Sequence, residues 1–215
     1  MLENLLSICF YIEFFIGLLC YHKFDKGLKI FFLSSAIGAL HDFTIRMMKN
    51  PIQINTEQLV FMMSIGTIYF SYFLHLMKQT NRKKILIIFF GVLILLISVE
   101  IKFFGINTYR IWFTDIILFF FLLIYSVISL VKIQFENINP VKKIVNNLIG
   151  IPLVLYFIFL IHYDIYVGLL WNSPAGQFLY IMDDLFIRPI DFLLLICTII
   201  AYLCQPKQES YLQLQ

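Results

Sequence analysis

An acid, a base and a second acid lie at helical spacing in the last hydrophobic segment of the chain. Asp184 and Arg188 are four residues apart, and Asp191 follows three residues later. In one continuous α-helix this spacing puts all three side chains on one face, where opposite charges can pair. Ionisable groups are costly in lipid, so we expect this face to point into a helix bundle. Comparable groups in other segments are Glu13, Asp42, Arg46 and Asp115.

The chain is too apolar for a soluble domain. Of its 215 residues, 61% are hydrophobic and 13% are charged, and the mean hydropathy is +0.88. A helix of about 20 apolar residues crosses the hydrocarbon core of a bilayer. Seven stretches of the chain meet this length, namely residues 4–21, 28–47, 59–77, 85–103, 111–131, 148–170 and 178–203. We predict an all-α polytopic membrane protein, a seven-helix bundle formed as one domain by residues 1–204 and followed by a short polar tail at 205–215.

The basic residues predict the orientation of this bundle. Most of the 16 Lys and Arg residues fall in the connections after the first, third and fifth predicted spans, or in the tail. Lys and Arg concentrate on the cytoplasmic side of membrane proteins. We therefore expect these three connections and the C-terminus in the cytoplasm, and the N-terminus outside.

Acidic residues gather in the opposite, outer halves of the predicted spans. Acids contribute little to topology, so their position is informative about function. On the second span, Ser34, Gly38 and Asp42 share a face whose small residues allow a neighbouring helix to approach closely. Our leading hypothesis is a non-enzymatic sensing, binding or accessory module with an acidic, outward-facing polar cavity. The cavity would bind a small ligand or a partner membrane protein, and its polar network would comprise Glu13, Asp42, Arg46, Asp115, Asp184, Arg188 and Asp191.

A metal-dependent membrane hydrolase is the first alternative. His41, His162 and Asp164 lie in the outer halves of two spans, and such ligands can hold zinc with one position left for water. In outline, seven spans with His and Asp residues resemble the alkaline ceramidase and adiponectin-receptor superfamily. The paired histidines that this superfamily carries in its last span have no counterpart here, because residues 178–203 contain no His.

A proton- or cation-coupled transporter is the second alternative. Buried carboxyl groups on several helices can relay protons or hold a cation. The chain lacks the paired, Gly- or Pro-interrupted spans typical of a transporter midplane, since Pro152 and Pro189 are single interruptions. A purely structural role also remains open, in which the Asp184, Arg188 and Asp191 side chains neutralise one another and fix helix packing.

Short sequence motifs resemble those of small bacterial seven-span proteins that are similar in layout to the membrane input modules of sensor histidine kinases. The motifs are Tyr11-Ile12-Glu13-Phe14-Phe15, the basic turn Asn81-Arg82-Lys83-Lys84, and Ile106-Asn107-Thr108-Tyr109. The resemblance implies a stand-alone module in the bacterial cytoplasmic (inner) membrane and assigns no reaction. If the module senses a signal, the short tail predicts that the output would come from another protein, such as a partner membrane protein.

Several familiar classes are disfavoured. A retinal protein needs a Lys in its last helix, and residues 178–203 contain none. The acid-Arg-aromatic and Asn-Pro motifs of G-protein-coupled receptors are absent, since the corresponding places read His75-Leu76-Met77-Lys78 and Arg188-Pro189-Ile190. The four cysteines lack metal-binding spacing. We expect no cofactor and no nucleic-acid partner; the expected surroundings are the lipid bilayer.

Overall fold

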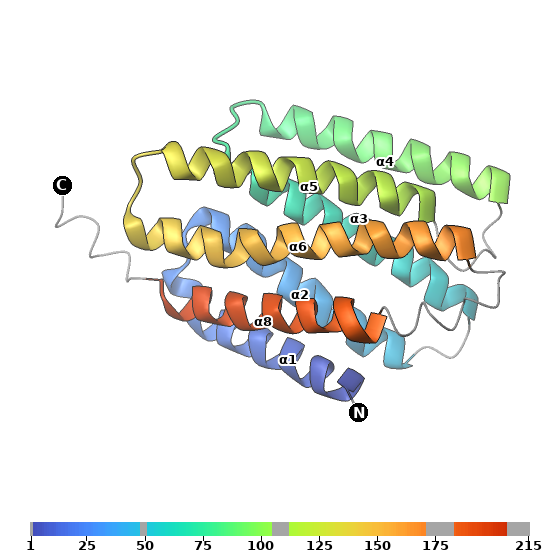
Figure 1. Cartoon of the computed structure of the whole chain (residues 1–215), viewed down its shortest axis with the longest axis horizontal. Coiled ribbons are helices and arrows are strands. Elements are labelled where there is room, and N and C mark those ends of the chain that lie inside the picture. The colour runs from blue at the N-terminus through green and yellow to red at the C-terminus, as the bar shows by residue number, and fades with distance from the viewer. Residues whose placement is uncertain (1, 48–50, 105–111, 171–182, 206–215) are drawn as a thin grey trace.

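The computed structural model describes residues 2–47, 51–104, 112–170 and 183–205, and every regular element within them is a helix. The elements are α1 (Leu2–Cys20), η1 (Tyr21–Lys23), α2 (Lys26–Met47), α3 (Pro51–Leu76), α4 (Arg82–Phe104), α5 (Trp112–Phe135), α6 (Pro140–Leu170), η2 (Asp183–Ile187) and α8 (Arg188–Leu203). The prediction of an all-α chain is confirmed. The long helices lie side by side along one axis, and α1 begins and α8 ends at opposite ends of the bundle (Figure 1).

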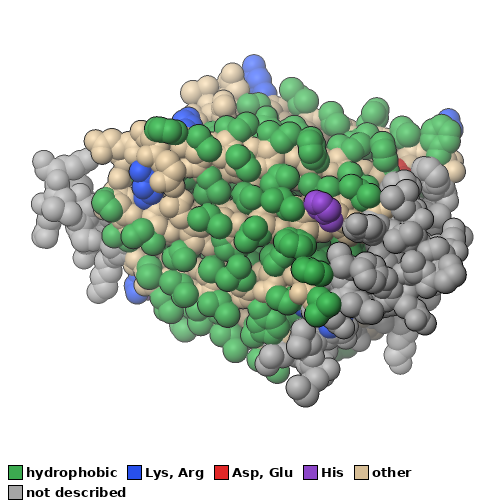
Figure 2. Space-filling view, in the orientation of Figure 1, with side chains coloured by type: hydrophobic (Ala, Val, Ile, Leu, Met, Phe, Trp, Pro, Cys, Tyr) green, Lys and Arg blue, Asp and Glu red, His purple; other side chains and the backbone are tan. Residues whose placement is uncertain are grey.

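Six helices in the described part of the chain are long and apolar enough to cross a membrane. Their candidate spans are Leu6–Lys23, Lys26–Ile45, Arg82–Phe103, Phe113–Phe135, Pro140–Ile165 and Leu185–Leu203. The apolar part of α3, Val60–Leu76, is shorter. Hydrophobic side chains dominate the face of the bundle shown in Figure 2. These features are those of an integral membrane protein, as the composition predicts.

The helix α6 starts eight residues earlier than its apolar stretch indicates. Oδ1 of Asn139 accepts a hydrogen bond of 2.8 Å from the backbone N–H of Val141, and Pro140 occupies the first helical position. Asn before the helix and Pro at its first position are both favoured starts. With 31 residues, α6 is about 46 Å long, compared with about 30 Å for the hydrocarbon core. The helix is therefore longer than the apolar layer is thick.

The segment before α8 departs from the continuous α-helix expected between Asp184 and Arg188. Residues Asp183–Ile187 form the π-helical turn η2, and α8 begins at Arg188 with Pro189 in its first turn. Proline lacks an N–H and its ring displaces the carbonyl four residues earlier, which favours a wider turn. The predicted four-residue spacing between Asp184 and Arg188 is therefore not that of an α-helix, whereas Arg188 and Asp191 do share α8.

An aromatic core packs α2, α3 and α8 together. Phe24, Tyr72, Phe73 and Tyr202 are each at most 1% exposed. The ring centroids of Phe24 and Tyr202 are 4.8 Å apart. A Cβ atom at Gly17 would lie 2.5 Å from Cε2 of Phe32, so glycine is needed where α1 approaches α2 and α8. This core joins the helices at the end of the bundle where α8 ends.

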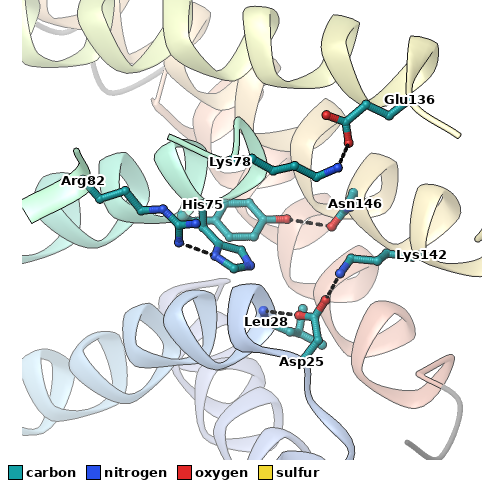
Figure 3. A network of polar contacts seen from close by, with 9 residues as sticks. Asp25, Leu28, His75, Lys78, Arg82, Glu136, Lys142 and Asn146 are labelled. Atoms are coloured by element: carbon teal, nitrogen blue, oxygen red, sulfur yellow. Dashed lines mark hydrogen bonds and ion pairs between the residues drawn. The ribbon is translucent and has the colours of Figure 1, made fainter. Parts of the chain in front are cut away.

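Three connections meet at that same end, which we call the basic end. Lys142 Nζ at the start of α6 lies 2.5 Å from Asp25 Oδ2 before α2, and Lys78 Nζ after α3 lies 2.9 Å from Glu136 Oε2 after α5 (Figure 3). Nη1 of Arg82 lies 2.7 Å from Nδ1 of His75. The connections predicted to share one side of the membrane therefore do share one end of the bundle.

Asp25 is held in its charged form at this end. Burial alone would raise its pKa. The hydrogen bond and positive charge of Lys142, together with a 2.8 Å hydrogen bond from the Leu28 N–H, outweigh burial and lower the pKa of Asp25 below its ordinary value of 3.8. The Asp25 carboxylate thus fixes the start of α2 against the start of α6.

Candidate functional site: an interior polar cavity

A cavity of about 90 Å³ lies between α1, α2, α3, α5, α6 and α8. Hydrophobic residues form much of its wall, among them Phe10, Phe31 and Leu122. Its polar lining consists of Glu13, Ser34, Ser35, Tyr69, Tyr156, Asp191 and Thr198. Since a water molecule takes about 30 Å³, the cavity has room for about three waters or a ligand of similar size.

Helical periodicity explains how these side chains meet. On α8, Asp191, Leu195 and Thr198 follow one another at intervals of four and three residues, so they share a face. On α2, Ser34 and Gly38 do the same. The polar face of α8 therefore turns toward α1 and α2, as expected for ionisable groups in an apolar chain.

A hydrogen-bonded chain runs from the cavity toward the basic end. The Ser35 hydroxyl donates to Oε1 of Glu13, whose side chain is only 5% exposed. The Tyr202 hydroxyl lies 2.8 Å from Ser35 Oγ. Because Ser35 has one hydrogen and donates it to Glu13, its oxygen accepts from Tyr202. The Tyr202 hydroxyl is also a hydrogen-bond partner of the Glu13 carboxyl group, so both hydroxyls converge on Glu13.

Asp42 lies one helical turn beyond Gly38, at the side of the cavity away from the basic end. Its Oδ1 accepts a 3.0 Å hydrogen bond from Ser7, and its Oδ2 accepts a 3.1 Å bond from the Tyr11 hydroxyl. Ser7 and Tyr11 are four residues apart on α1, so one carboxylate bridges two turns of the neighbouring helix. Asp42 is thus part of the α1–α2 contact and is not among the residues that line the cavity.

The remaining predicted network residues are placed differently. Asp115 is half-buried in the first turn of α5, and Arg188 is half-buried at the start of α8. Neither lines the cavity. The side chains of Arg46 and Asp184 lie outside the described residues. Of the seven side chains predicted to form an interior network, the structure brings Glu13 and Asp191 to one cavity, with Asp42 on an adjoining turn.

The three proposed metal ligands occupy different settings. His41 is half-buried on α2, with its ring stacked at 3.8 Å on Phe61. On α6, His162 is exposed and its Nδ1 lies 2.7 Å from the Ile158 carbonyl oxygen, whereas Asp164 is 3% exposed. Within the described ranges, no group of three or more His, Cys, Asp or Glu side chains is arranged to hold a metal ion.

Sequence reasoning missed the hydroxyl groups that complete the site. Ser35, Tyr69, Thr198 and Tyr202 are each at most 8% exposed and lie on the cavity or on its hydrogen-bonded chain. A signal was available in the spacing, because Thr198 and Tyr202 continue the α8 face that carries Asp191. Hydroxyls in apolar helices usually bond to their own backbone, so this signal was weak.

Carboxyl and hydroxyl groups define what the cavity can bind. Its described lining contains two acids and no Lys, Arg, His or Cys side chain. Such a set offers oxygen atoms to a cation or to a hydrogen-bond donor. No protein-family model, curated protein or solved structure matches the chain.

Proposed function

We propose that the chain is a sensing, binding or accessory module of the bacterial cytoplasmic membrane, with seven spanning helices and an acidic interior cavity that binds a small ligand. The observation that carries this proposal is the convergence of Glu13 and Asp191, from α1 and α8, on one cavity within an otherwise apolar bundle. Burying acids in this way is costly in a membrane protein, and such groups commonly serve a function.

The proposed direction of access is from outside. Between the cavity and the basic end lie the buried rings of Phe24, Tyr72, Phe73 and Tyr202. These rings close the cavity on that side. The concentration of Lys and Arg at the basic end supports a cytoplasmic location for it. The ligand would then enter from the opposite, external end, where Asp42 lies.

Cysteine labelling tests this orientation. In a variant with all four native cysteines replaced by Ser, single cysteines would be placed at Lys84 and Gln58, both exposed. A membrane-impermeant maleimide applied to intact cells should label Gln58→Cys but reach Lys84→Cys only after the membrane is opened. Labelling of Lys84→Cys in intact cells would contradict the proposed orientation.

Ligand binding is tested by thermal unfolding in lipid nanodiscs. The panel should contain small inorganic cations, ammonium and methylammonium, small neutral alcohols and small carboxylates, because only such molecules suit about 90 Å³. A ligand at about 100 times its Kd should stabilise the protein by about 2.7 kcal/mol. We expect at least one panel member to raise the unfolding midpoint.

A pair of Gly→Ala variants provides the control for site occupancy. Gly38 lines the cavity, and a Cβ there would meet Phe10 at an ordinary 3.9 Å, so Gly38→Ala should fold while reducing the cavity. A Cβ at Gly91 would meet nothing within 4 Å. The ligand effect should weaken in Gly38→Ala and persist in Gly91→Ala. If no panel member stabilises the wild type, or Gly38→Ala responds like the wild type, the proposed cavity function is wrong.

A further inference from the structure

Glu13 and Glu100 are equally buried but have different hydrogen-bond donors. Each is 5% exposed. Glu100 accepts two backbone hydrogen bonds, from Phe113 N at 3.0 Å and Thr114 N at 2.9 Å, and a third from the Thr114 hydroxyl. These donors belong to the N-terminus of α5, where a carboxylate is favoured. Glu13 lies in the middle of α1, where no helix terminus compensates its charge.

Among the described residues, the polar groups that line the cavity beside Glu13 are hydroxyls and one further acid, not Lys or Arg side chains. The hydrogen-bond partners of Glu13 within the described residues are the hydroxyl groups of Ser35 on α2 and Tyr202 on α8. The other titratable groups facing its cavity are Asp191 of α8, Tyr69 of α3 and Tyr156 of α6, while α5 contributes only Phe119 and Leu122. Tyr202 of α8 follows Ser35, and Asp42 of α2 lies one turn farther out. None of these described groups carries a positive charge.

A carboxylate stabilised only by hydroxyl groups is disfavoured in such a setting, because burial in a low-dielectric interior removes the water that stabilises its charge. The group becomes neutral in one of two ways: it takes up a proton, or it holds a cation nearby. The cavity next to Glu13 has room for about three waters, or for one alkali ion with part of its hydration shell.

We propose that Glu13 and its cavity form a site for one monovalent cation, at which a proton and a small alkali ion such as Na⁺ exchange one for one. The inference rests on the proposed ligand-binding function and names the class of ligand. When the proton leaves the Glu13 carboxyl group for cavity water, the alkali ion enters, so the charge of the site is unchanged. Ser34, Ser35 and Tyr69 supply neutral oxygen ligands beside the carboxylate.

The hydrogen-bond chain gives Glu13 a defined acceptor role. Since Tyr202 donates to Ser35 and Ser35 donates to Glu13, the chain stabilises the ionised carboxylate and favours cation binding over proton binding. Removing the Ser35 hydroxyl should therefore favour proton binding over cation binding at Glu13. The buried aromatic rings beyond Tyr202 stop the chain from reaching the basic end, so the site exchanges with the external side.

Infrared spectroscopy of the full chain in lipid nanodiscs tests whether the Glu13 carboxyl group binds a proton. A protonated carboxylic acid has a C=O stretch that disappears on ionisation. The wild type should show such a band at low pH and lose it as the pH rises. The band should be absent from Glu13→Gln and retained in Glu100→Gln and Asp191→Asn. A wild-type spectrum identical to that of Glu13→Gln at every pH would overturn the proposal.

The cation is tested by repeating the pH titration in sodium chloride and in choline chloride at equal ionic strength. Choline is too large for a cavity of about 90 Å³, so it controls for screening. Above the Kd, each tenfold increase in Na⁺ should lower the midpoint of the band by about one pH unit, as one-for-one exchange requires. A midpoint that moves equally in both salts, or in neither, would overturn cation exchange.

Ser35→Ala provides a second variant in case Glu13→Gln fails to fold. Hydrogen bonds to charged groups contribute about 1.5–3 kcal/mol, so loss of the Ser35 donor should raise the midpoint of the Glu13 band by about one to two pH units. The matched control is Ser98→Ala, because Ser98 is exposed on α4 and bonds to the Ile94 carbonyl. An unchanged midpoint in Ser35→Ala would show that the band does not come from Glu13.

The two proposals fail separately. A neutral molecule or a carboxylate of the panel could stabilise the wild type while Na⁺ leaves the pH midpoint of the infrared band unchanged. In that case the cavity binds a ligand and the cation assignment is wrong. If the band responds to Na⁺ but Gly38→Ala responds like the wild type, the cation binds at Glu13 and the cavity adjoining Gly38 does not hold it, which overturns the proposed site.

Discussion

Lys142 and Asp25 form an ion pair between the start of α6 and the residue preceding α2, with 2.5 Å between Nζ and Oδ2. The two residues are far apart in sequence and join the connection between α1 and α2 to the connection between α5 and α6. The Asp25 carboxylate also accepts the Leu28 N–H, so it anchors the first turn of α2 at the same time. The arrangement makes the basic end a fixed part of the bundle.

A double-mutant cycle measures the coupling free energy between Asp25 and Lys142. Asp25→Asn and Lys142→Gln each remove one charge while keeping the side-chain size. Both side chains are about one-third exposed, so we expect a coupling free energy of about 1 kcal/mol in equilibrium unfolding. The control cycle uses Lys78 and Glu136, where Lys78 is 67% exposed and solvent weakens the attraction. A coupling in the control as large as that of Asp25 and Lys142 would contradict this reasoning.

The same carboxylate predicts how stability depends on pH at the acid limit. The pKa of Asp25 is lower in the folded protein than in the unfolded chain, so the pair contributes its full stability above the ordinary value of 3.8. This contribution is lost as the pH falls through the lowered pKa. The unfolding midpoint of the wild type should therefore drop more steeply below about pH 4 than that of Asp25→Asn. Parallel curves for the two proteins would refute the assigned role.

Substitution by alanine should affect the stability of the bundle differently at Gly17 and at Gly91. A Cβ at Gly17 would lie 2.5 Å from Phe32 and 2.9 Å from Tyr202, both in the aromatic core. Gly17→Ala should therefore destabilise the bundle by about 1–3 kcal/mol, as overpacking does. Gly91→Ala meets no atom within 4 Å and should be neutral or slightly stabilising. Equal thermal midpoints for the two variants would show that α1 does not pack as described.

Hydrophobic length and charge predict much of the fold but little of the geometry within it. The apolar stretches locate the helices because a helix of about 20 apolar residues matches the hydrocarbon core of a bilayer. The early start of α6 at Pro140 escapes this rule, since it depends on the Asn139 cap and lies outside the apolar stretch. A hydropathy pattern contains no information about such capping.

The candidate site could likewise be predicted only in part from the sequence. Glu13 and Asp191 could be identified because an acid in an apolar span is unusual. Which acids meet depends on helix rotation, and the π-helical turn before Pro189 changes that rotation between Asp184 and Arg188. Ser35 and Tyr202 could not be assigned to Glu13, since their contact joins α1 and α2 to α8, which is distant from them in sequence.

Glu100 should act as a cap for α5, joining it to α4. Its carboxylate accepts the N–H groups of Phe113 and Thr114, which have no partner within their own helix. Glu100→Gln replaces one acceptor oxygen by an NH₂ donor, so we expect a loss of about 1.5–3 kcal/mol in stability and faster hydrogen exchange in the first turn of α5. Hydrogen exchange followed by mass spectrometry measures this region directly. Ser98→Ala, on the exposed face of the same helix, should leave both quantities unchanged. If exchange in the first turn of α5 is equally slow in Glu100→Gln and Ser98→Ala, the Glu100 carboxylate is not the group that protects those amides.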